Sequence, residues 1–138
     1  MMNAHNLVII ASGVFFLNAL LTGVWKYLQM VDSESGHAHI YVDTAHRASL
    51  MYAFACILLA VFVNISQLGA TLELIASLML VTYFAIAILT YMLAGLKQNT
   101  DNQVHNASAA VRVFMWSLIT AEIGGFLILF YGVLIALL

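Results

Sequence analysis

The chain contains no proline, a single cysteine and very few charged residues. Without proline, a long helix is free of the kink that a missing backbone N–H produces. The lone Cys56 excludes a disulfide within the chain. Charged residues make up 7% of the 138 residues, whereas a soluble domain carries about 25%. The net charge of −2 offers no basic surface to a nucleic acid. These absences exclude an ordinary soluble domain and a nucleic-acid partner.

Apolar residues take the place of the missing charges and reach 64% of the chain. Four apolar runs are as long as the roughly 20 residues that a membrane-spanning helix requires. They cover about 7–28, 44–65, 72–96 and 109–138. The polar stretches between them contain no repeat and no sign of a second domain. The sequence therefore predicts one all-α membrane domain over residues 1–138, a four-transmembrane-helix bundle in up-down-up-down order, in contact with the lipid bilayer.

The basic residues are few and lie on one side of this arrangement. They are Lys26, Arg47, Lys97 and Arg112, and each flanks one of the two longer breaks. Loops that are rich in Lys and Arg stay in the cytoplasm. We therefore predict a multi-pass protein with loops 29–43 and 97–108 in the cytoplasm and both termini outside.

Histidines are unusually common near the start of the second span. His37, His39 and His46 lie within ten residues of one another. If the second helix begins near residue 36, His39, Asp43 and His46 fall at i, i+4 and i+7 on one stripe. Imidazole binds zinc, copper and iron, and a histidine inside a membrane helix suits haem iron. Asp43 would then hold the second ring nitrogen of the ligand.

Two other interpretations of the histidines stay open. His37 fits a simple interfacial residue in a polar loop. A divalent-metal site built from His37, His39, Asp43 and His46 is a second possibility, although the sequence has no His-Glu-x-x-His motif and no cysteine pair.

Three polar residues inside the spans are candidates for a functional site. Glu122 lies ten residues past Arg112, about 15 Å deep at 1.5 Å per residue. Asn18 lies at a similar depth on the first span, so we predict that Asn18 and Glu122 meet. The pair would either join helices through a hydrogen bond or make Glu122 a proton donor beside a ligand. Tyr91, late in the third span, either packs in the bundle or donates a proton at the same site.

The stretch 45–52, Ala-His-Arg-Ala-Ser-Leu-Met-Tyr, opens the second span after a polar loop. Together with four spans and the Gly23-Val24-Trp25 end of the first span, it resembles the bacterial styrene oxide isomerases. The resemblance implies a trimer in the inner membrane that holds haem b near its subunit interfaces, with ferric iron acting as a Lewis acid on an epoxide. It implies His46 as the axial ligand and Tyr91 near a small apolar substrate. The family's Gly-Pro and Asn-Gly pairs are replaced here by Ala48-Ser49 and Tyr52-Ala53.

The sequence thus leads to one hypothesis and several alternatives. The hypothesis is a homo-oligomeric haem b protein ligated by His46, with Lys26, Arg47 or Arg112 pairing with the haem propionates. Catalysis on a small apolar molecule would involve Tyr91, Glu122 and Asn18. An electron-transfer cytochrome b, in which His39 of a neighbouring subunit supplies a second ligand, is one alternative. A small membrane subunit without catalysis is another.

Overall fold

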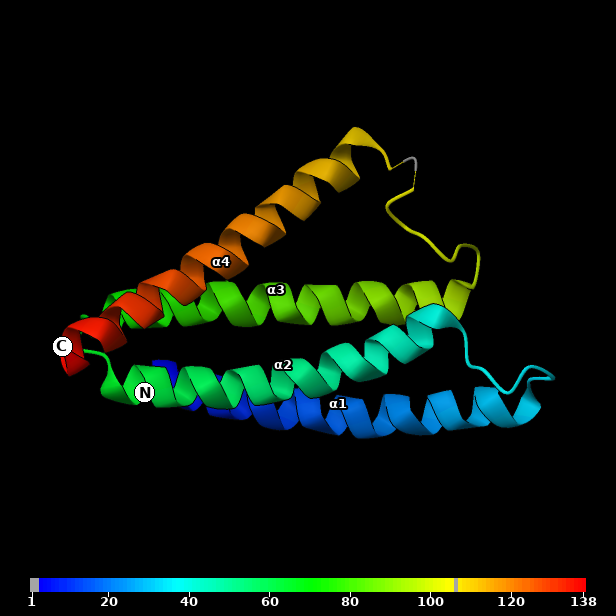
Figure 1. The fold of residues 1–138 in the computed structure, drawn as a ribbon, viewed down its shortest axis with the longest axis horizontal. Coiled ribbons are helices and arrows are strands. Elements are labelled where there is room, and N and C mark those ends of the chain that lie inside the picture. The colour runs from blue at the N-terminus through cyan, green and yellow to red at the C-terminus, as the bar shows by residue number, and fades with distance from the viewer. Residues whose placement is uncertain (1–2, 106) are drawn as a thin grey trace.

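The computed structural model describes residues 3–105 and 107–138 as four long helices. They are α1 (Ala4–Asp32), α2 (Ile40–Ile65), α3 (Ala70–Lys97) and α4 (Ala109–Leu137). All four are long and apolar enough to cross a membrane. The predicted all-α, up-down-up-down bundle is confirmed, and each predicted span lies on one helix (Figure 1).

Polar residues set most of the helix starts. The Asn3 side chain accepts a hydrogen bond from the backbone N–H of Asn6, at 2.8 Å, and Ser108 caps α4 through the N–H of Val111. Such side chains satisfy the unpaired N–H groups of a first turn. The start of α2 is capped by the His39 ring, so this helix begins at Ile40 and not near residue 36. The predicted helical stripe from His39 to His46 is therefore wrong at its first member.

Small residues form much of the buried interior, and most large apolar side chains point outward. Cys56, Ala45 and Ala76 are fully buried, whereas Phe54, Leu21 and Trp116 are more than 60% exposed. Membrane helices pack in this way because lipid is as apolar as the side chains, so close packing drives association. The chain is a small multi-pass membrane protein by the length and composition of its helices.

The four helices are not equally packed against one another. In Figure 1, α1, α2 and α3 lie along one another, whereas α4 crosses α3 and its N-terminal half stands away from the bundle. α4 contacts α2 and α3 but not α1. The turn between α2 and α3 shares one end with both termini, and the two longer loops, 33–39 and 98–108, share the other.

Candidate functional site

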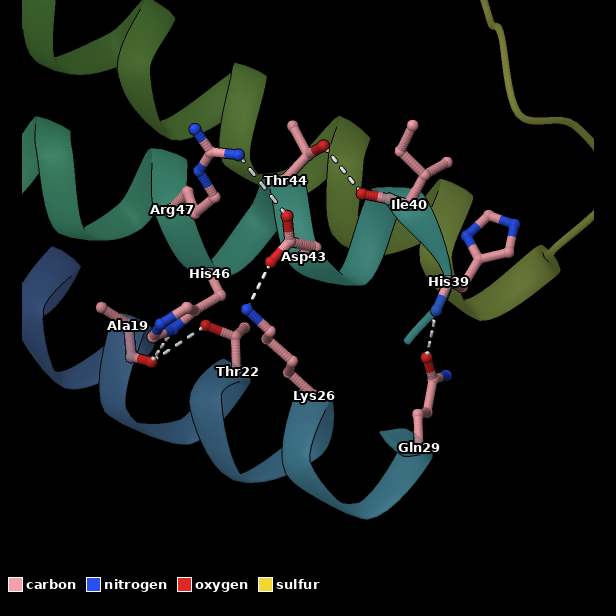
Figure 2. Close-up of polar contacts among 10 residues, drawn as sticks. All are labelled: Ala19, Thr22, Lys26, Gln29, His39, Ile40, Asp43, Thr44, His46 and Arg47. Carbon is pink, nitrogen blue, oxygen red and sulfur yellow. Dashed lines mark hydrogen bonds and ion pairs between the residues drawn. The ribbon is translucent and has the colours of Figure 1, made fainter. Parts of the chain in front are cut away.

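His46 lies between α1 and α2, with its ring against the backbone of α1 (Figure 2). Its Nδ1 lies 2.8 Å from the Ala19 carbonyl oxygen. A carbonyl only accepts hydrogen bonds, so Nδ1 carries the ring proton and donates it. Nε2 makes no hydrogen bond within residues 3–105 and 107–138. In the neutral form of the ring, this hydrogen bond leaves the lone pair on Nε2.

Two residues of α1 lie beside the His46 ring and its hydrogen bond. A Cβ atom added at Gly23 would lie 3.1 Å from His46 Cε1, closer than side chains normally approach. Glycine at this position lets the imidazole lie flat against α1. Thr22 donates its hydroxyl to the Asn18 carbonyl at 2.7 Å, and the Ala19 carbonyl oxygen that accepts from His46 lies 3.2 Å from the same hydroxyl. The sequence prediction missed Ala19 and Thr22, because neither residue type signals a ligand's partner.

Asp43 holds two cations and not the histidine. One carboxylate oxygen lies 2.5 Å from Lys26 Nζ, and the other lies 3.6 Å from Arg47, one turn further along α2. The prediction that Asp43 accepts the His46 ring proton is therefore wrong (Figure 2). The Asp43 carboxylate pairs with the two cations, whereas the His46 imidazole hydrogen-bonds the backbone of α1. Lys26, Asp43 and Arg47 together carry a net charge of +1.

His39 lies outside the helix and is occupied by other partners. Its Nδ1 accepts the N–H of Tyr41 at 3.3 Å, and its Nε2 lies 3.4 Å from Asp101 of the loop between α3 and α4. The structure does not bring His39 to His46, and His37 is exposed in the preceding loop. In the part of the chain that the structure describes, no three His, Cys, Asp or Glu side chains gather as a metal would require. The divalent-metal alternative gains no support.

Glu122 meets a tyrosine and not Asn18. Its Oε1 lies 3.5 Å from the Tyr52 hydroxyl, which donates the hydrogen bond. Asn18 instead donates to Ser49 Oγ at 2.8 Å, and α1 does not contact α4. The predicted pair is therefore wrong, because α4 packs on the far side of α2 and α3. Apart from its depth in the span, nothing in the sequence identified Tyr52 as the partner of Glu122.

Tyr91 and Tyr52 line one cavity of about 400 Å³ between α2 and α3. Arg47 and Ala48 also border it. Tyr91 stacks on Tyr41, with ring centroids 6.2 Å apart, and Tyr52 stacks on Phe84 at 4.1 Å. Of the predicted catalytic residues, Tyr91 and Glu122 thus lie near Tyr52, whereas Asn18 does not line this cavity and hydrogen-bonds Ser49 and Met92. His46 points to α1, on a different face of α2 from this cavity.

The three basic residues predicted to pair with haem propionates do not all lie at one place in the structure. Lys26 and Arg47 meet at Asp43, close to His46 along the helix axes (Figure 2). Arg112 is exposed near the start of α4, the part of that helix which stands away from α1 and α2 (Figure 1). The structure therefore brings two of the three predicted propionate partners together. No protein family, no curated protein and no solved structure matches this chain.

Proposed function

We propose that the protein is an integral membrane haem b protein in which His46 Nε2 binds the iron. The hydrogen bond from Nδ1 to the Ala19 carbonyl carries this proposal. Histidines that bind metals almost always donate their other ring N–H to a backbone carbonyl or a carboxylate. The bond fixes the tautomer that leaves Nε2 unprotonated, which is the form that binds iron.

The surroundings of His46 support a flat apolar ligand. Phe16 on α1 and Phe54 on α2 are exposed and meet edge to face, with centroids 6.5 Å apart. They provide exposed apolar surface on the same two helices, α1 and α2, that hold the histidine. Lys26 and Arg47 lie toward the loop end, where propionates would reach water and positive charge. The residues present therefore fit a haem whose ring faces the apolar side chains and whose acidic edge faces the loops.

One chain offers a surface and not an enclosure at this position. A macrocycle on α1 and α2 would leave its other face open, so we propose that a second copy of the chain covers it. His39 and His46 of one chain are about 10 Å apart along the axis of α2, at 1.5 Å per residue. They cannot bracket one iron, so a second protein ligand would have to come from the other copy. When bound, haem supplies an iron that acts as a Lewis acid if one position stays open, or carries electrons if both are filled.

The test is haem binding by purified protein from cells supplied with haem precursor. The wild type is expected to show a Soret absorbance band, and His46→Ala is expected to lose it. His37→Ala is the matched control, because it removes an exposed histidine of the nearby loop and should keep the band. Imidazole added to His46→Gly should restore the band if only the ligand has been lost.

Two results would reject the proposal. An unchanged band in His46→Ala removes His46 as the ligand. No band in either protein removes haem and leaves the small membrane subunit without a cofactor as the interpretation. If the band is present, the spin state separates the two activities, since a low-spin iron with two strong ligands indicates an electron carrier.

A further inference from the structure

A cavity lies where α4 leaves α3, at the end of the bundle that carries the two longer loops (Figure 1). It has a volume of about 460 Å³ and is bounded by the last turns of α3, the loop 98–108 and the first turns of α4. We call it the α3–α4 cavity. His46 lies between α1 and α2, so the proposed haem site and this cavity share no residue.

The lining of the α3–α4 cavity is amphiphilic. Its loop residues are mostly polar, whereas its helical residues are mostly apolar and include Leu93, Phe114 and Met115. From Thr90 to Lys97 the lining extends about 10 Å along α3, at 1.5 Å per residue. Leu93 is 55% exposed, so the apolar part of the cavity opens onto the helix surface that faces lipid in a membrane.

The charge beside this cavity is of one sign. Lys97 lines it, and Arg112 directly follows the lining residue Val111 on α4. In the part of the chain that the structure describes, neither Lys97 nor Arg112 forms an ion pair, and the three remaining residues have no carboxylate side chain. No acidic residue lines the cavity, and none lies in the first turn of α4. The two cations are therefore available to an anion.

Contacts with α2 hold the loop wall of the cavity. The backbone N–H of Gln103 donates to the Tyr41 hydroxyl at 2.7 Å, and Asp101 lies 3.4 Å from His39 Nε2. Asp101 is the only acidic residue of the loop, and its contact with His39 leaves it outside the lining of the cavity. The loop therefore closes the cavity without adding a negative charge to it.

We propose that the α3–α4 cavity binds an anionic phospholipid of the surrounding membrane. The headgroup pairs with Lys97 and Arg112, and an acyl chain lies against Leu93 and Phe114. A free phosphate would use only the polar end of the cavity, whereas a lipid uses both ends. The basic residues predict that this end of the bundle faces the cytoplasm, and the cytoplasmic leaflet carries anionic lipid.

The experiment measures, by native mass spectrometry, the lipids that the protein retains from nanodiscs of phosphatidylglycerol and phosphatidylcholine in equal amounts. The wild type is expected to retain phosphatidylglycerol in preference. Lys97→Gln and Arg112→Gln should each weaken this retention about fivefold, the contribution of a basic residue near an anionic membrane surface. Lys26→Gln is the matched control, because it removes a charge at the same end of the bundle that is already paired with Asp43. It should retain phosphatidylglycerol like the wild type.

A second pair of variants tests the cavity itself. Leu93 and Leu89 both lie on α3 and are 55% and 56% exposed, but only Leu93 lines the cavity. Leu93→Trp would fill part of the space that an acyl chain needs, so it should weaken the retention of phosphatidylglycerol several-fold. Leu89→Trp should leave the retention unchanged.

Four outcomes overturn the proposal. Equal retention of the two lipids by the wild type removes the preference for an anionic headgroup. An equal loss in Lys26→Gln and Lys97→Gln shows a general attraction to the positive end of the bundle and no site. Equal retention by Leu93→Trp and Leu89→Trp removes the cavity as the place of binding. Displacement of phosphatidylglycerol from the wild type by excess glycerol phosphate shows that the site takes a free anion and not a lipid.

Discussion

A backbone carbonyl, and not a charged side chain, orients His46. The nearest carboxylate in sequence, Asp43, is held by Lys26 and Arg47, while the imidazole donates to Ala19 on the neighbouring helix. Gly23 has no side chain and so leaves room for the His46 ring against α1. The arrangement fixes the ring without placing a buried negative charge beside it.

Gly23→Ala tests the contact between the ring and α1. The added Cβ would meet His46 Cε1 at 3.1 Å, so the ring has to shift and its hydrogen bond to Ala19 weakens. Loss of a partner that orients a metal ligand costs about 10-fold or more in affinity. We expect haem affinity to fall by about that factor, measured by haem titration of the apoprotein. Gly13→Ala in the same helix meets nothing within 4 Å and should leave the affinity unchanged. Equal affinities for the two variants would contradict the contact.

Asp43→Asn tests the assignment of the ring proton. Lys26 and Asp43 are about one-third exposed and Arg47 is more exposed, so the ion pairs are screened by water. We expect a loss of at most about 1 kcal/mol in the free energy of unfolding. The Soret band should keep its position and intensity, because His46 donates to Ala19. Loss of the Soret band in Asp43→Asn would indicate that Asp43, and not Ala19, orients His46.

At the scale of the helices, the sequence predicted which segments span and most of their ends, but it missed both ends of α1 and the start of α2. The predicted span 44–65 corresponds to α2, which starts earlier, at Ile40, because the helix continues through Asp43 back to its cap at His39. The cap by His39 depends on a ring that bends back to the backbone of Tyr41. Hydropathy carries no information on that geometry.

The contacts between helices could be predicted even less. Asn18 and Glu122 have matching depths, yet Asn18 binds Ser49 and Glu122 binds Tyr52. Apolar residues surround all four helices, so no apolar stripe marks the face that turns inward. His46 was predicted as a site residue from its type and depth, but its partner Ala19 was not, because every residue carries a carbonyl.

Gly95→Ala tests the close approach of α2 and α3. A Cβ at Gly95 would lie 2.8 Å from Val42 Cγ2 and 3.2 Å from the Val42 backbone nitrogen, so the two helices would have to separate. Such overpacking costs about 1–3 kcal/mol. We expect a lower midpoint of thermal unfolding in detergent. Gly124→Ala on α4 has open space around its Cβ and should be neutral or stabilising by up to about 1 kcal/mol. An equal midpoint for both variants would show that the helices do not meet at Gly95.

At the scale of the whole molecule, the polar chemistry is divided between the two ends of an apolar bundle. The loop end carries the ion pairs of Asp43 and the His39 cap of α2, and the end with the termini carries a cavity lined by Glu73, called here the Glu73 cavity. Large apolar side chains cover the surface between them. The two ends of the bundle therefore differ in their chemistry, and the orientation of the protein decides which compartment each end faces.

The four basic residues predict that orientation. Lys26, Arg47, Lys97 and Arg112 all lie in the part of the bundle nearer the two longer loops, and none lies in the turn that joins α2 to α3. Because basic loops remain in the cytoplasm, the termini and the Glu73 cavity should face outward. Alkaline phosphatase fused after Leu138 should therefore be active and a fluorescent protein there dark, with the reverse for fusions at Asn102. Equal expression of both fusions, checked by immunoblot, is the control. A fluorescent fusion at Leu138 would contradict this orientation and place both termini on the cytoplasmic side.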